Sequence, residues 1–553
     1  MNFERDFHID RMKSEQFDVL VIGGGITGVG VALDAASRGL RVALVEKDDF
    51  SSGTSSKSSK LIHGGLRYLQ QGEIGLVYEA LHERQRLRKN APHLVQLLPF
   101  MIPILTKDGV ISRKIARALG SALWMYDLTG GWRIGKFHRR LKAKAAHAHL
   151  PTMPFEKLAS AYLYYDAAAD DSRLCVAIAR TAAQHGAAIA NQCRVTKIVH
   201  NDQGIACGAQ VQPTGGDPFT IRATTVVNAA GVWADDVRQA DEGTNPHSIR
   251  PAKGIHITVP WNKVRNDIAI VIPVRKDKRS LFVVPWIPNG DGTFQYTYVG
   301  TTDTDFAGGV NESQTSAEDI HYVLEALNQS ITTKVTVDDV TAVWSGLRPL
   351  VSNEDGSAAT GKTADLSRKH KVKVSPSGVI SIMGGKLTTY RKMSEHTVDE
   401  VVKHTGNARK CKTKSLSFIG AAGFKPSLLK GPDAHLAQRF GSEMNMIKDL
   451  IAENPTFGRP LIDGLPYLRA EAVFACRNEM AQTLDDVLSR RTRARIINRR
   501  ATLASARSVA ELMAGELNWD SAEIDRQISE FIDSCSREEA AGMVSEAEFL
   551  ASQ

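Results

Sequence analysis

The stretch "FDVLVIGGGITGVGVALDAASRGLRVALVEK", residues 17–47, decides the fold of the chain. Its apolar run at 17–22 predicts a buried strand, and the small and apolar residues that continue through Ala35 predict a helix. A second apolar run at 41–45 predicts another buried strand, which ends at Glu46. Strand, glycine-rich turn, helix and strand in this order predict a parallel α/β unit.

The glycines of this stretch have the spacing of a dinucleotide site. Gly23, Gly25 and Gly28 form the pattern GxGxxG. The first glycine permits a tight turn, the second a close approach of the backbone to a pyrophosphate, and the third close packing of helix on strand. The amino end of the helix then faces the negative pyrophosphate. Glu46 lies where an acidic residue binds the adenosine ribose, so the stretch predicts a dinucleotide but leaves FAD and NAD open.

Two later stretches favour FAD over NAD. Residues 224–237 predict a further strand of the same sheet, followed by a small-residue turn and a helix. Residues 378–406 predict a strand, a turn at Gly384 and Gly385, and a helix whose positive end, together with Lys386, faces a ligand. A reduced flavin carries negative charge on its pyrimidine edge, whereas nicotinamide needs no such site. We therefore expect FAD as the cofactor.

Length and charge limit the class of protein. A chain of 553 residues exceeds one hydrophobic core, so two or three domains are expected. The net charge of +8 suits nucleic acid, an anionic membrane or an anionic substrate. The sequence has neither the aromatic run of an RNA-binding module nor zinc-finger spacing, so we expect no nucleic-acid partner. It also has no run of about 18 apolar residues, so we expect no transmembrane helix.

Cysteine usage and the amino-terminal segment indicate a cytoplasmic protein. The six cysteines show no CxxC and no metal-like spacing, which predicts reduced thiols and no metal site. The first segment, "MNFERDFHIDRMKSEQ", is charged and lacks the apolar core of a secretory signal. We expect a cytoplasmic location, with peripheral association to the inner face of the cell membrane for the reason given below.

The segment "KLIHGGLRYL" supplies the candidate proton acceptor. Oxidation of a carbinol requires a base near the hydroxyl, and an imidazole has a suitable pKa. His63 lies in this segment beside two glycines and is the first candidate; Lys253 and His256, in "KGIH", are its competitors. Arg67 and Tyr68, in the same segment as His63, are expected to bind the substrate.

Three further cations are candidates for an anionic substrate. Arg348 lies between a glycine turn and a proline in "SGLRPL", and a guanidinium is suited to bidentate phosphate binding. Lys386 follows the second glycine turn, and Arg368 lies in the charged run "DLSRKHKVKV". We assign Arg348, Lys386, Arg368 and Lys253 to substrate binding, and Arg348 and Lys386 with His63 to catalysis. The absence of a GxSxG elbow argues against serine hydrolysis.

Five sequence blocks resemble the FAD-dependent glycerol-3-phosphate dehydrogenases, within the D-amino-acid-oxidase-like flavoprotein superfamily. "GGGITG", "GTSSKSSKLIHGGLRYL", "VGTTDTDF", "WSGLRPL" and "GGKLTTYRKMSEH" occur in that family's order over residues 17–404. Residues 479–495 resemble its helical extension more weakly. The resemblance implies oxidation of sn-glycerol 3-phosphate to dihydroxyacetone phosphate, with hydride passing from C2 to N5 of FAD and electrons to a membrane quinone.

The resemblance also implies three structural parts: a FAD-binding Rossmann-type domain, an interleaved antiparallel-sheet substrate domain and a C-terminal helical domain. The expected division is 15–85, 155–240 and 340–405 for the FAD-binding domain, 86–154 and 241–339 for the substrate domain, and 406–553 for the helical domain. Together with the glycine motifs it assigns to FAD binding Gly23, Gly25, Gly28, Glu46, Ser55, Ser58, Val195, Gly231, Gly384, Gly385, Leu387 and Thr388.

The motifs leave the electron acceptor open. A second fingerprint for NAD is absent from the sequence, so the acceptor is a diffusible quinone or oxygen. The stretch 112–149 mixes Trp124, Trp132 and Phe137 with many lysines and arginines, which favours docking on an anionic membrane and a quinone acceptor. A soluble oxidase is the alternative, and a non-catalytic dinucleotide sensor is an alternative of another class. A homodimer also stays open.

Overall fold

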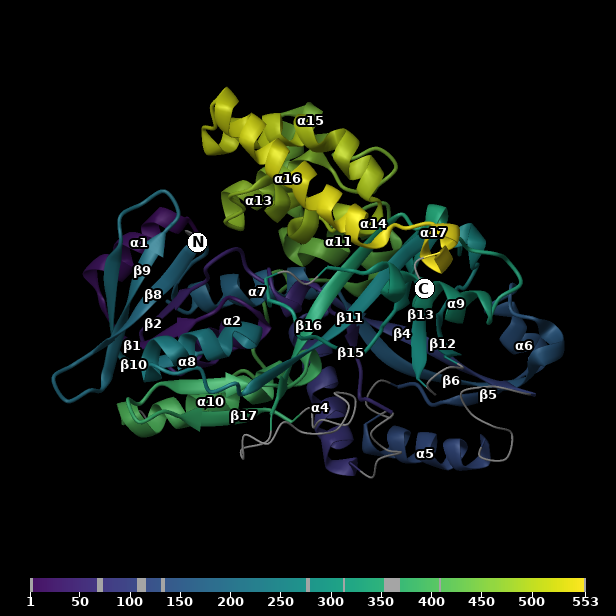
Figure 1. The fold of residues 1–553 in the computed structure, drawn as a ribbon, viewed down its shortest axis with the longest axis horizontal. Coiled ribbons are helices and arrows are strands. Elements are labelled where there is room, and N and C mark those ends of the chain that lie inside the picture. The colour runs from purple at the N-terminus through teal and green to yellow at the C-terminus, as the bar shows by residue number, and fades with distance from the viewer. Residues whose placement is uncertain are drawn as a thin grey trace.

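The computed structural model describes residues 3–66, 73–106, 116–130, 135–274, 279–311, 314–352, 369–406 and 409–551. Two sheets and a C-terminal group of helices form the molecule (Figure 1). The first sheet with its helices occupies one side, the second sheet occupies the other, and the C-terminal helices lie across the top in this view. The expected α/β class with a helical C-terminal part is confirmed.

The first sheet, sheet A, has a parallel centre. Its strand order is β17-β18-β10-β1-β2-β7, with β9 on β10 and β8 on β9. The pairs β18–β10, β10–β1, β1–β2 and β2–β7 are parallel, whereas β17, β8 and β9 pair antiparallel. The strands are β1 (Gln16–Ile22), β2 (Val42–Val45), β7 (Ala188–Ala190), β8 (Cys193–His200), β9 (Ala206–Pro213), β10 (Phe219–Asn228), β17 (Lys371–Val374) and β18 (Ile380–Met383).

Helices pack on sheet A through apolar and small residues. α2 (Ile26–Ser37) lies between α7 (Asp171–Gln184) and α10 (Tyr390–Thr405) and contacts both. Gly28 of α2 explains the close approach of helix and turn, because a Cβ there would lie 1.9 Å from the carbonyl oxygen of Gly23. Two further helices flank the sheet: α1 (Arg5–Ser14) and α8 (Ala234–Glu242).

The second sheet, sheet B, is mainly antiparallel. Its order is β15-β11-β14-β13-β12-β4-β6-β3, with β16 on β11 and β5 on β6; β12 and β4 pair parallel. The strands are β3 (Leu61–Ile62), β4 (Val95–Leu105), β5 (Arg139–Lys142), β6 (Leu158–Ala169), β11 (Ile249–Pro260), β12 (Ala269–Pro273), β13 (Ser280–Pro288), β14 (Phe294–Gly300), β15 (Thr304–Asp305) and β16 (Ala342–Val351). The helices of this part are α4 (Ile74–Asn90), α5 (Ala116–Thr129), α6 (Ala143–Ala148) and α9 (Ala317–Asn328).

Three strands lie in a different sheet from the expected division, among them the short β3, which falls in the segment 15–85 and pairs with β6. β6 and β16 fall in segments assigned to the FAD-binding domain, yet β6 pairs with β4 along its length and β16 pairs with β11. Both strands bury residues on both of their faces. An apolar run of this kind predicts a buried strand but carries no signal for which sheet it joins. The remainder of the division stays a prediction.

The described chain from residue 409 onward forms helices around two apolar clusters. The longer ones are α11 (Ala434–Phe440), α12 (Met444–Glu453), α13 (Arg469–Asn478), α15 (Arg499–Leu517) and α16 (Ser521–Gly542), with the short α14 (Ala494–Ile497) and α17 (Glu546–Ala551). Side chains of Asn498 and Asp520 cap the amino ends of α15 and α16. Within the described residues, no helix combines the length and apolarity that crossing a bilayer requires.

Candidate active site

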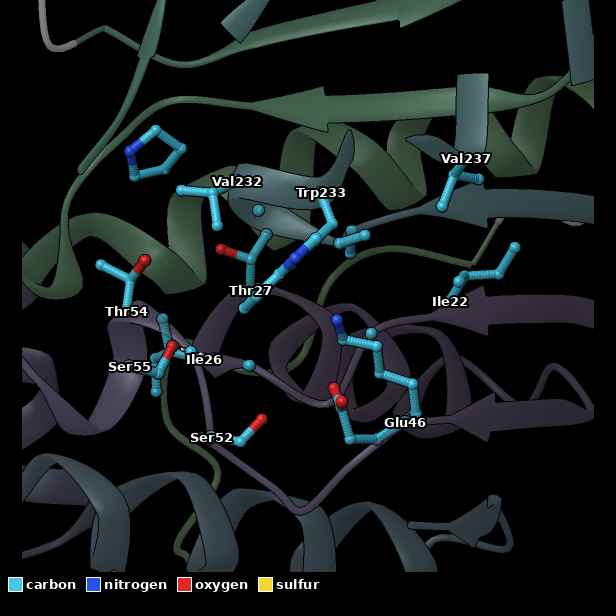
Figure 2. A pocket seen from close by; sticks show the side chains of 18 of the residues that line it. Ile22, Ile26, Thr27, Glu46, Ser52, Thr54, Ser55, Val232, Trp233 and Val237 are labelled. Atoms are coloured by element: carbon cyan, nitrogen blue, oxygen red, sulfur yellow. Dashed lines mark hydrogen bonds between the residues drawn. The ribbon is translucent and has the colours of Figure 1, made fainter. Parts of the chain in front are cut away.

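A long cavity lies at the carboxyl ends of the parallel strands of sheet A. We call it the dinucleotide cavity, and its lining comes from the turns after β1, β2, β10 and β18. Figure 2 shows Ile26, Thr54 and Ser55 at one end of it and Glu46 with Ile22 at the other. Ligands of open α/β sheets bind at this edge because the turns and the helix amino ends converge there.

The glycines of the first turn fit a bound pyrophosphate. Gly23 has φ +113°, a conformation that favours glycine, and a Cβ there would lie 2.7 Å from the carbonyl oxygen of Ala229. Gly25 lines the cavity directly, whereas Gly28 packs beneath the turn. The backbone N–H of Ile26, the first residue of α2, donates to the hydroxyl of Ser55 over 2.9 Å. Backbone and helix end therefore present the surface that a dinucleotide requires.

Glu46 lies in the wall of the dinucleotide cavity, where the motif places it. Its two carboxylate oxygens accept hydrogen bonds from the backbone N–H groups of Gly24 (2.6 Å) and Asp48 (2.9 Å). Burial nevertheless raises the pKa of Glu46 to about 7, because those two donors offset only part of the desolvation of the charge. Ribose hydroxyls would add donors to the same carboxylate. Its role at the ribose stays a prediction.

The second glycine turn connects the dinucleotide cavity to another cavity. Gly384 and Gly385 have φ of 75° and 88°, and a Cβ on Gly385 would lie 2.3 Å from Sδ of Met393. Lys386 follows in extended conformation, and a short 3₁₀ turn then leads into α10. Lys386 lines both cavities, as do the following residues that complete the shared wall: Ile26, Thr54, Ser55, Pro349, Gly385 and Leu387.

The adjoining cavity, here called the histidine cavity, brings together residues from distant parts of the chain. His63, His256, Arg348 and Lys386 all line it. They come from the segment after β3, from β11, from β16 and from the turn after β18. The structure therefore places the expected base, its histidine competitor and two expected cations around one space that adjoins the dinucleotide cavity.

His63 is held through its backbone. Its N–H donates to Oγ1 of Thr388 over 3.2 Å, and the same hydroxyl is 3.2 Å from the His63 carbonyl oxygen. The next N–H, of Gly64, donates to the hydroxyl of Tyr126 (3.1 Å) and to Asp166 (3.2 Å). The turn after β18, α5 and β6 thus hold the peptide that carries the imidazole. Thr388 lines this cavity and not the dinucleotide cavity, and its expected contact with FAD stays a prediction.

Arg348 is oriented by the segment after β14. Its guanidinium donates to Asp303 (3.2 Å), to Oγ1 of Thr301 (3.1 Å) and to the carbonyl of Thr302 (3.0 Å). A Cβ on Gly254 would lie 2.4 Å from its Nη2, so the glycine of "KGIH" leaves the room that this arginine occupies. The result is a pre-oriented guanidinium in the cavity wall.

His256 is buried beside an aromatic ring and two cationic side chains. Its ring stacks on Trp344 with centroids 4.6 Å apart, and its Nε2 lies 2.8 Å from Oγ of Ser59. Burial, with the nearby charges of Lys60 and Arg348, holds the pKa of His256 well below its usual value. Its Nδ1 has no hydrogen-bond partner among the described residues. A neutral imidazole can accept a proton from a hydroxyl, but this environment disfavours its charged form.

Lys253 does not line either cavity, and its assignment to substrate binding stays a prediction. Successive residues of a strand point to opposite faces, and on β11 Gly254 and His256 face the histidine cavity. Lys253 therefore points to the other face, where its amine pairs with Asp319 over 2.5 Å. Both faces of β11 are largely buried, so the sequence does not show which of its residues point toward the cavity.

The other predicted residues divide between the two cavities. Val195 and Gly231 line the dinucleotide cavity. Ser58 lines the histidine cavity, and its hydroxyl donates to Asp171 over 2.6 Å; its contact with the cofactor stays a prediction. Arg67, Tyr68 and Arg368 lie outside the described residues.

Sequence reasoning missed several lining residues. Lys57 and Ser59 lie in the histidine cavity, in the serine-rich loop that precedes His63. Trp233 lines the dinucleotide cavity (Figure 2). The amine of Lys47 lies 3.9 Å from the centroid of its ring. The loop composition was a signal for the first two, whereas nothing local marks the tryptophan. Among the described residues, no cluster of histidine, cysteine, aspartate or glutamate could hold a metal ion.

The fold and the two adjoining cavities define a class of protein, the FAD-dependent oxidoreductases. The sequence model of the family described as "FAD dependent oxidoreductase" matches residues 18–391, and that of the "C-terminal domain of alpha-glycerophosphate oxidase" matches residues 411–524. The expectation of FAD as the cofactor is confirmed by this match. The glycine cradle and the continuous wall at Lys386 fit that cofactor.

Curated relatives narrow the class. The chain is 37% identical to glycerol-3-phosphate dehydrogenase 2 of Mycobacterium tuberculosis over 537 residues, 94% of this chain and 88% of the relative. It is 38% identical to the mitochondrial glycerol-3-phosphate dehydrogenase of Mus musculus over 534 residues, 91% of this chain and 71% of the relative. The chain belongs to the FAD-dependent glycerol-3-phosphate dehydrogenase family.

Solved structures agree with this assignment. The glycerol-3-phosphate dehydrogenase of Bacillus halodurans, complexed with FAD, has a TM-score of 0.76 to this chain at 29% identity, covering 96% of this chain and 97% of its own. The L-alpha-glycerophosphate oxidase of Mycoplasma pneumoniae, with FAD bound, has a TM-score of 0.53 at 17% identity, covering 72% and 97%. The second likeness supports the fold alone.

Proposed function

We propose that this chain oxidises sn-glycerol 3-phosphate to dihydroxyacetone phosphate and passes the electrons to a membrane quinone. The observation that carries the proposal is the histidine cavity, in which His63, Arg348 and Lys386 converge beside the dinucleotide cavity. The curated relatives at 36–38% identity are named glycerol-3-phosphate dehydrogenases, which supports the same substrate.

The cationic residues of the histidine cavity suit the phosphate. Arg348 offers a guanidinium whose plane is set by Asp303 and Thr301, and Lys386 adds a point charge on the shared wall. A planar fork and a compact ammonium together fix a phosphate in position and orientation. The phosphate contacts would hold C2 of the substrate toward the shared wall.

A base near the C2 hydroxyl completes the arrangement. FAD, when bound, supplies the two-electron acceptor for the hydride. His63 accepts the hydroxyl proton, because its peptide is fixed by the turn after β18 and by β6, and the residue lines the cavity. His256 is the competitor: it lines the same cavity but lies in an environment that disfavours its protonated form.

Exposed aromatic and apolar residues beside basic ones support the quinone and membrane part of the proposal. On α5, Trp124 is 55% and Leu128 is 68% exposed, and Phe137 nearby is 48% exposed. Figure 1 shows α5 and α4 at the edge of the molecule opposite the C-terminal helices. Basic residues follow in β5 and α6, and such a mixture suits an anionic bilayer surface.

The decisive experiment is anaerobic reduction of the flavin by glycerol 3-phosphate. The purified holoenzyme should lose its yellow colour on mixing with this substrate, and glycerol without phosphate should leave the colour unchanged. Reoxidation by a soluble quinone analogue faster than by oxygen supports the dehydrogenase reading. Faster reoxidation by oxygen, with hydrogen peroxide formed, favours the soluble oxidase, and no reduction at all refutes the proposed activity.

A further inference from the structure

Three arginines of the C-terminal domain have partners in the FAD-binding part of the chain. Arg490, Arg491 and Arg493 lie between α13 and α14, and Arg491 and Arg493 are at most 2% exposed. Their carboxylate partners include Asp49 and Asp171, which lie more than 300 positions earlier. A buried charge is retained in a fold only when it is paired, so each contact links the two parts firmly.

The first link is at Asp49, in the turn that follows Glu46. One carboxylate oxygen of Asp49 accepts from Nε of Arg490 (2.6 Å) and Nη1 of Arg491 (2.7 Å), and the other accepts from Nη2 of Arg491 (2.8 Å). Asp49 is fully buried. The C-terminal domain therefore holds the end of the segment that carries the expected ribose ligand.

The second link is at Asp171, the first residue of α7. Nη2 of Arg493 donates to its Oδ1 over 2.8 Å and also to the carbonyl oxygen of Ser56. The other oxygen of Asp171 accepts from the hydroxyl of Ser58 (2.6 Å) and lies 3.6 Å from the amine of Lys60. Arg493 and Asp171 thus hold the loop 54–60 through contacts outside the two cavities.

The segment between these links forms the walls of both cavities. Thr54 and Ser55 line the two cavities together, and Ser58 and Ser59 line the histidine cavity. The hydroxyl of Ser59 lies 2.8 Å from Nε2 of His256, and its carbonyl accepts from the hydroxyl of Tyr298 (3.0 Å). A shift of the loop would move these side chains relative to His63, which follows it in the chain.

We propose that the C-terminal domain positions the segment 49–60 through these two links, with Arg493 acting through Asp171 on the histidine cavity and Arg490 with Arg491 acting through Asp49 on the dinucleotide cavity. Arg493 is a positioning residue: it donates to Asp171 and to the carbonyl oxygens of Ser56 and Ser489, its Nε lies 3.6 Å from Asp170, and it lines neither cavity. The part of this inference that concerns Arg493 and the histidine cavity rests on the proposed function, whereas the part that concerns Asp49 requires only that the protein binds FAD.

The two links predict separate effects, which simple packing would not produce. If the C-terminal domain served stability alone, any buried arginine of it would affect both cavities alike. Arg495 is a matched control because it lies in α14 beside Arg493, is 12% exposed, and pairs with Asp485 and Glu538 inside the C-terminal domain. A lysine at either position keeps the charge and loses the fork.

The experiment compares Arg493→Lys and Arg495→Lys as holoenzymes. Binding of dihydroxyacetone phosphate to the oxidised enzyme is measured from the change in flavin absorption, and FAD affinity is measured on the apo-protein. Arg493→Lys should weaken product binding about tenfold, the usual scale for losing a charge-assisted hydrogen bond. Its FAD affinity should stay within about twofold of wild type, and Arg495→Lys should change neither.

Asp171→Asn provides a second route to the same residue pair. It should weaken product binding at least as much, since Asp171 also holds Ser58 and Lys60. The double variant Arg493→Lys/Asp171→Asn should be no worse than Asp171→Asn alone, because the effect of Arg493 passes through Asp171. Two results would overturn the proposed effect of Arg493 on the histidine cavity. One is additive weakening of product binding in the double variant, and the other is an equal loss of product binding in Arg493→Lys and Arg495→Lys.

Asp49→Asn tests the other link without any substrate. It should weaken FAD binding to the apo-protein about tenfold while product binding to FAD-saturated enzyme stays within about twofold. Unchanged FAD affinity would overturn this side. If the flavin absorption of wild-type holoenzyme changes with neither glycerol 3-phosphate nor dihydroxyacetone phosphate, the proposed function fails. The FAD affinity of apo Asp49→Asn still decides whether the C-terminal domain positions the segment 49–60.

Discussion

The dinucleotide cavity and the histidine cavity share a wall but are lined differently. Much of the dinucleotide cavity lining follows β–α turns of a single sheet, after β1, β10 and β18. The lining of the histidine cavity comes from the loop 54–63, from β11 and β16 of the other sheet, and from the turn after β18. Glycine turns and apolar side chains make up much of the first, whereas the second gathers His63, His256, Arg348 and Lys386.

This difference implies that substitutions in the two cavities impair different properties of the protein. A turn backbone binds through N–H groups and shape, so single side chains there change how firmly a cofactor is held. The histidine cavity depends on placed side chains, so substitutions there should alter the chemistry while FAD stays bound. The predictions below test this division.

The largest expected effect is at His63. His63→Asn should slow anaerobic flavin reduction by glycerol 3-phosphate roughly 10²- to 10⁴-fold, the usual contribution of a general base. FAD content should equal that of wild type, because the dinucleotide cavity is untouched. Stopped-flow absorbance measures the rate, and His404→Asn, at the exposed end of α10, is the control.

The pH profile sharpens this test. The reduction rate of wild type should rise with pH through the pKa of the base, and that rise should vanish in His63→Asn. A slowing of less than about threefold with the rise intact would transfer the proton to His256, because Lys253 is engaged with Asp319 on the other face of β11.

Arg348→Lys should have the next largest effect. Lysine keeps the charge but loses the planar fork that Thr301 and Asp303 orient, so both the Michaelis constant and the reduction rate should worsen, together about 10- to 100-fold in kcat/KM. Arg250→Lys is the control, since Arg250 pairs with Asp305 and lines neither cavity. Wild-type kinetics in Arg348→Lys would place the phosphate elsewhere.

Glu46→Gln tests the dinucleotide side. Loss of a charge-assisted partner of the ribose should weaken FAD binding by about 1.5–3 kcal/mol, roughly 10- to 150-fold in the dissociation constant. Flavin reduction in the FAD-saturated variant should stay near the wild-type rate. Equal FAD affinity in variant and wild type, measured by titration of the apo-proteins, would remove Glu46 from the ribose.

The pKa of Glu46 adds a pH dependence without ligand. Since burial raises the pKa to about 7 in the folded apo-protein, the protonated form is favoured and its stability contribution is present below the unfolded pKa near 4.5. That contribution is lost as pH rises toward 7. The difference in unfolding free energy between apo wild type and apo Glu46→Gln should therefore change over this range, by up to about 3 kcal/mol. If the difference in unfolding free energy between the two apo-proteins did not vary with pH, the raised pKa of Glu46 would be contradicted.

The smallest effect is expected at the exposed face of α5. Vesicles with anionic lipid should bind the protein at low salt, and high salt should release part of it. The double substitution Trp124→Ser/Leu128→Ser should reduce vesicle binding several-fold. Ile532→Ser, a similarly exposed apolar residue on α16, should not, because Figure 1 places α16 at the opposite edge. Failure of wild type to bind such vesicles would favour the soluble oxidase.

The accuracy of the sequence predictions follows the same division between the cavities. The strand, turn and helix of residues 17–47 occur as predicted, as does the second turn at Gly384 and Gly385, because each depends on local glycine spacing and apolar runs. Arg348 and Lys386 carry strong local signals and do reach one cavity. Lys253 does not reach the cavity, and its amine pairs with Asp319 instead. The sequence could not predict this, because both faces of β11 are largely buried and neither is marked as the cavity face.

The sequence alone determined the parallel dinucleotide unit, the helical C-terminal part and a pool of cationic residues, because short-range spacing of glycine and apolar residues fixes backbone turns and secondary structure. Only the tertiary structure decided which face of β11 meets the cavity, that β6 and β16 join sheet B, and that Arg493 reaches Asp171 across more than 300 positions. These outcomes depend on pairing between distant segments, where burial requires each charge to find a partner that no local pattern specifies.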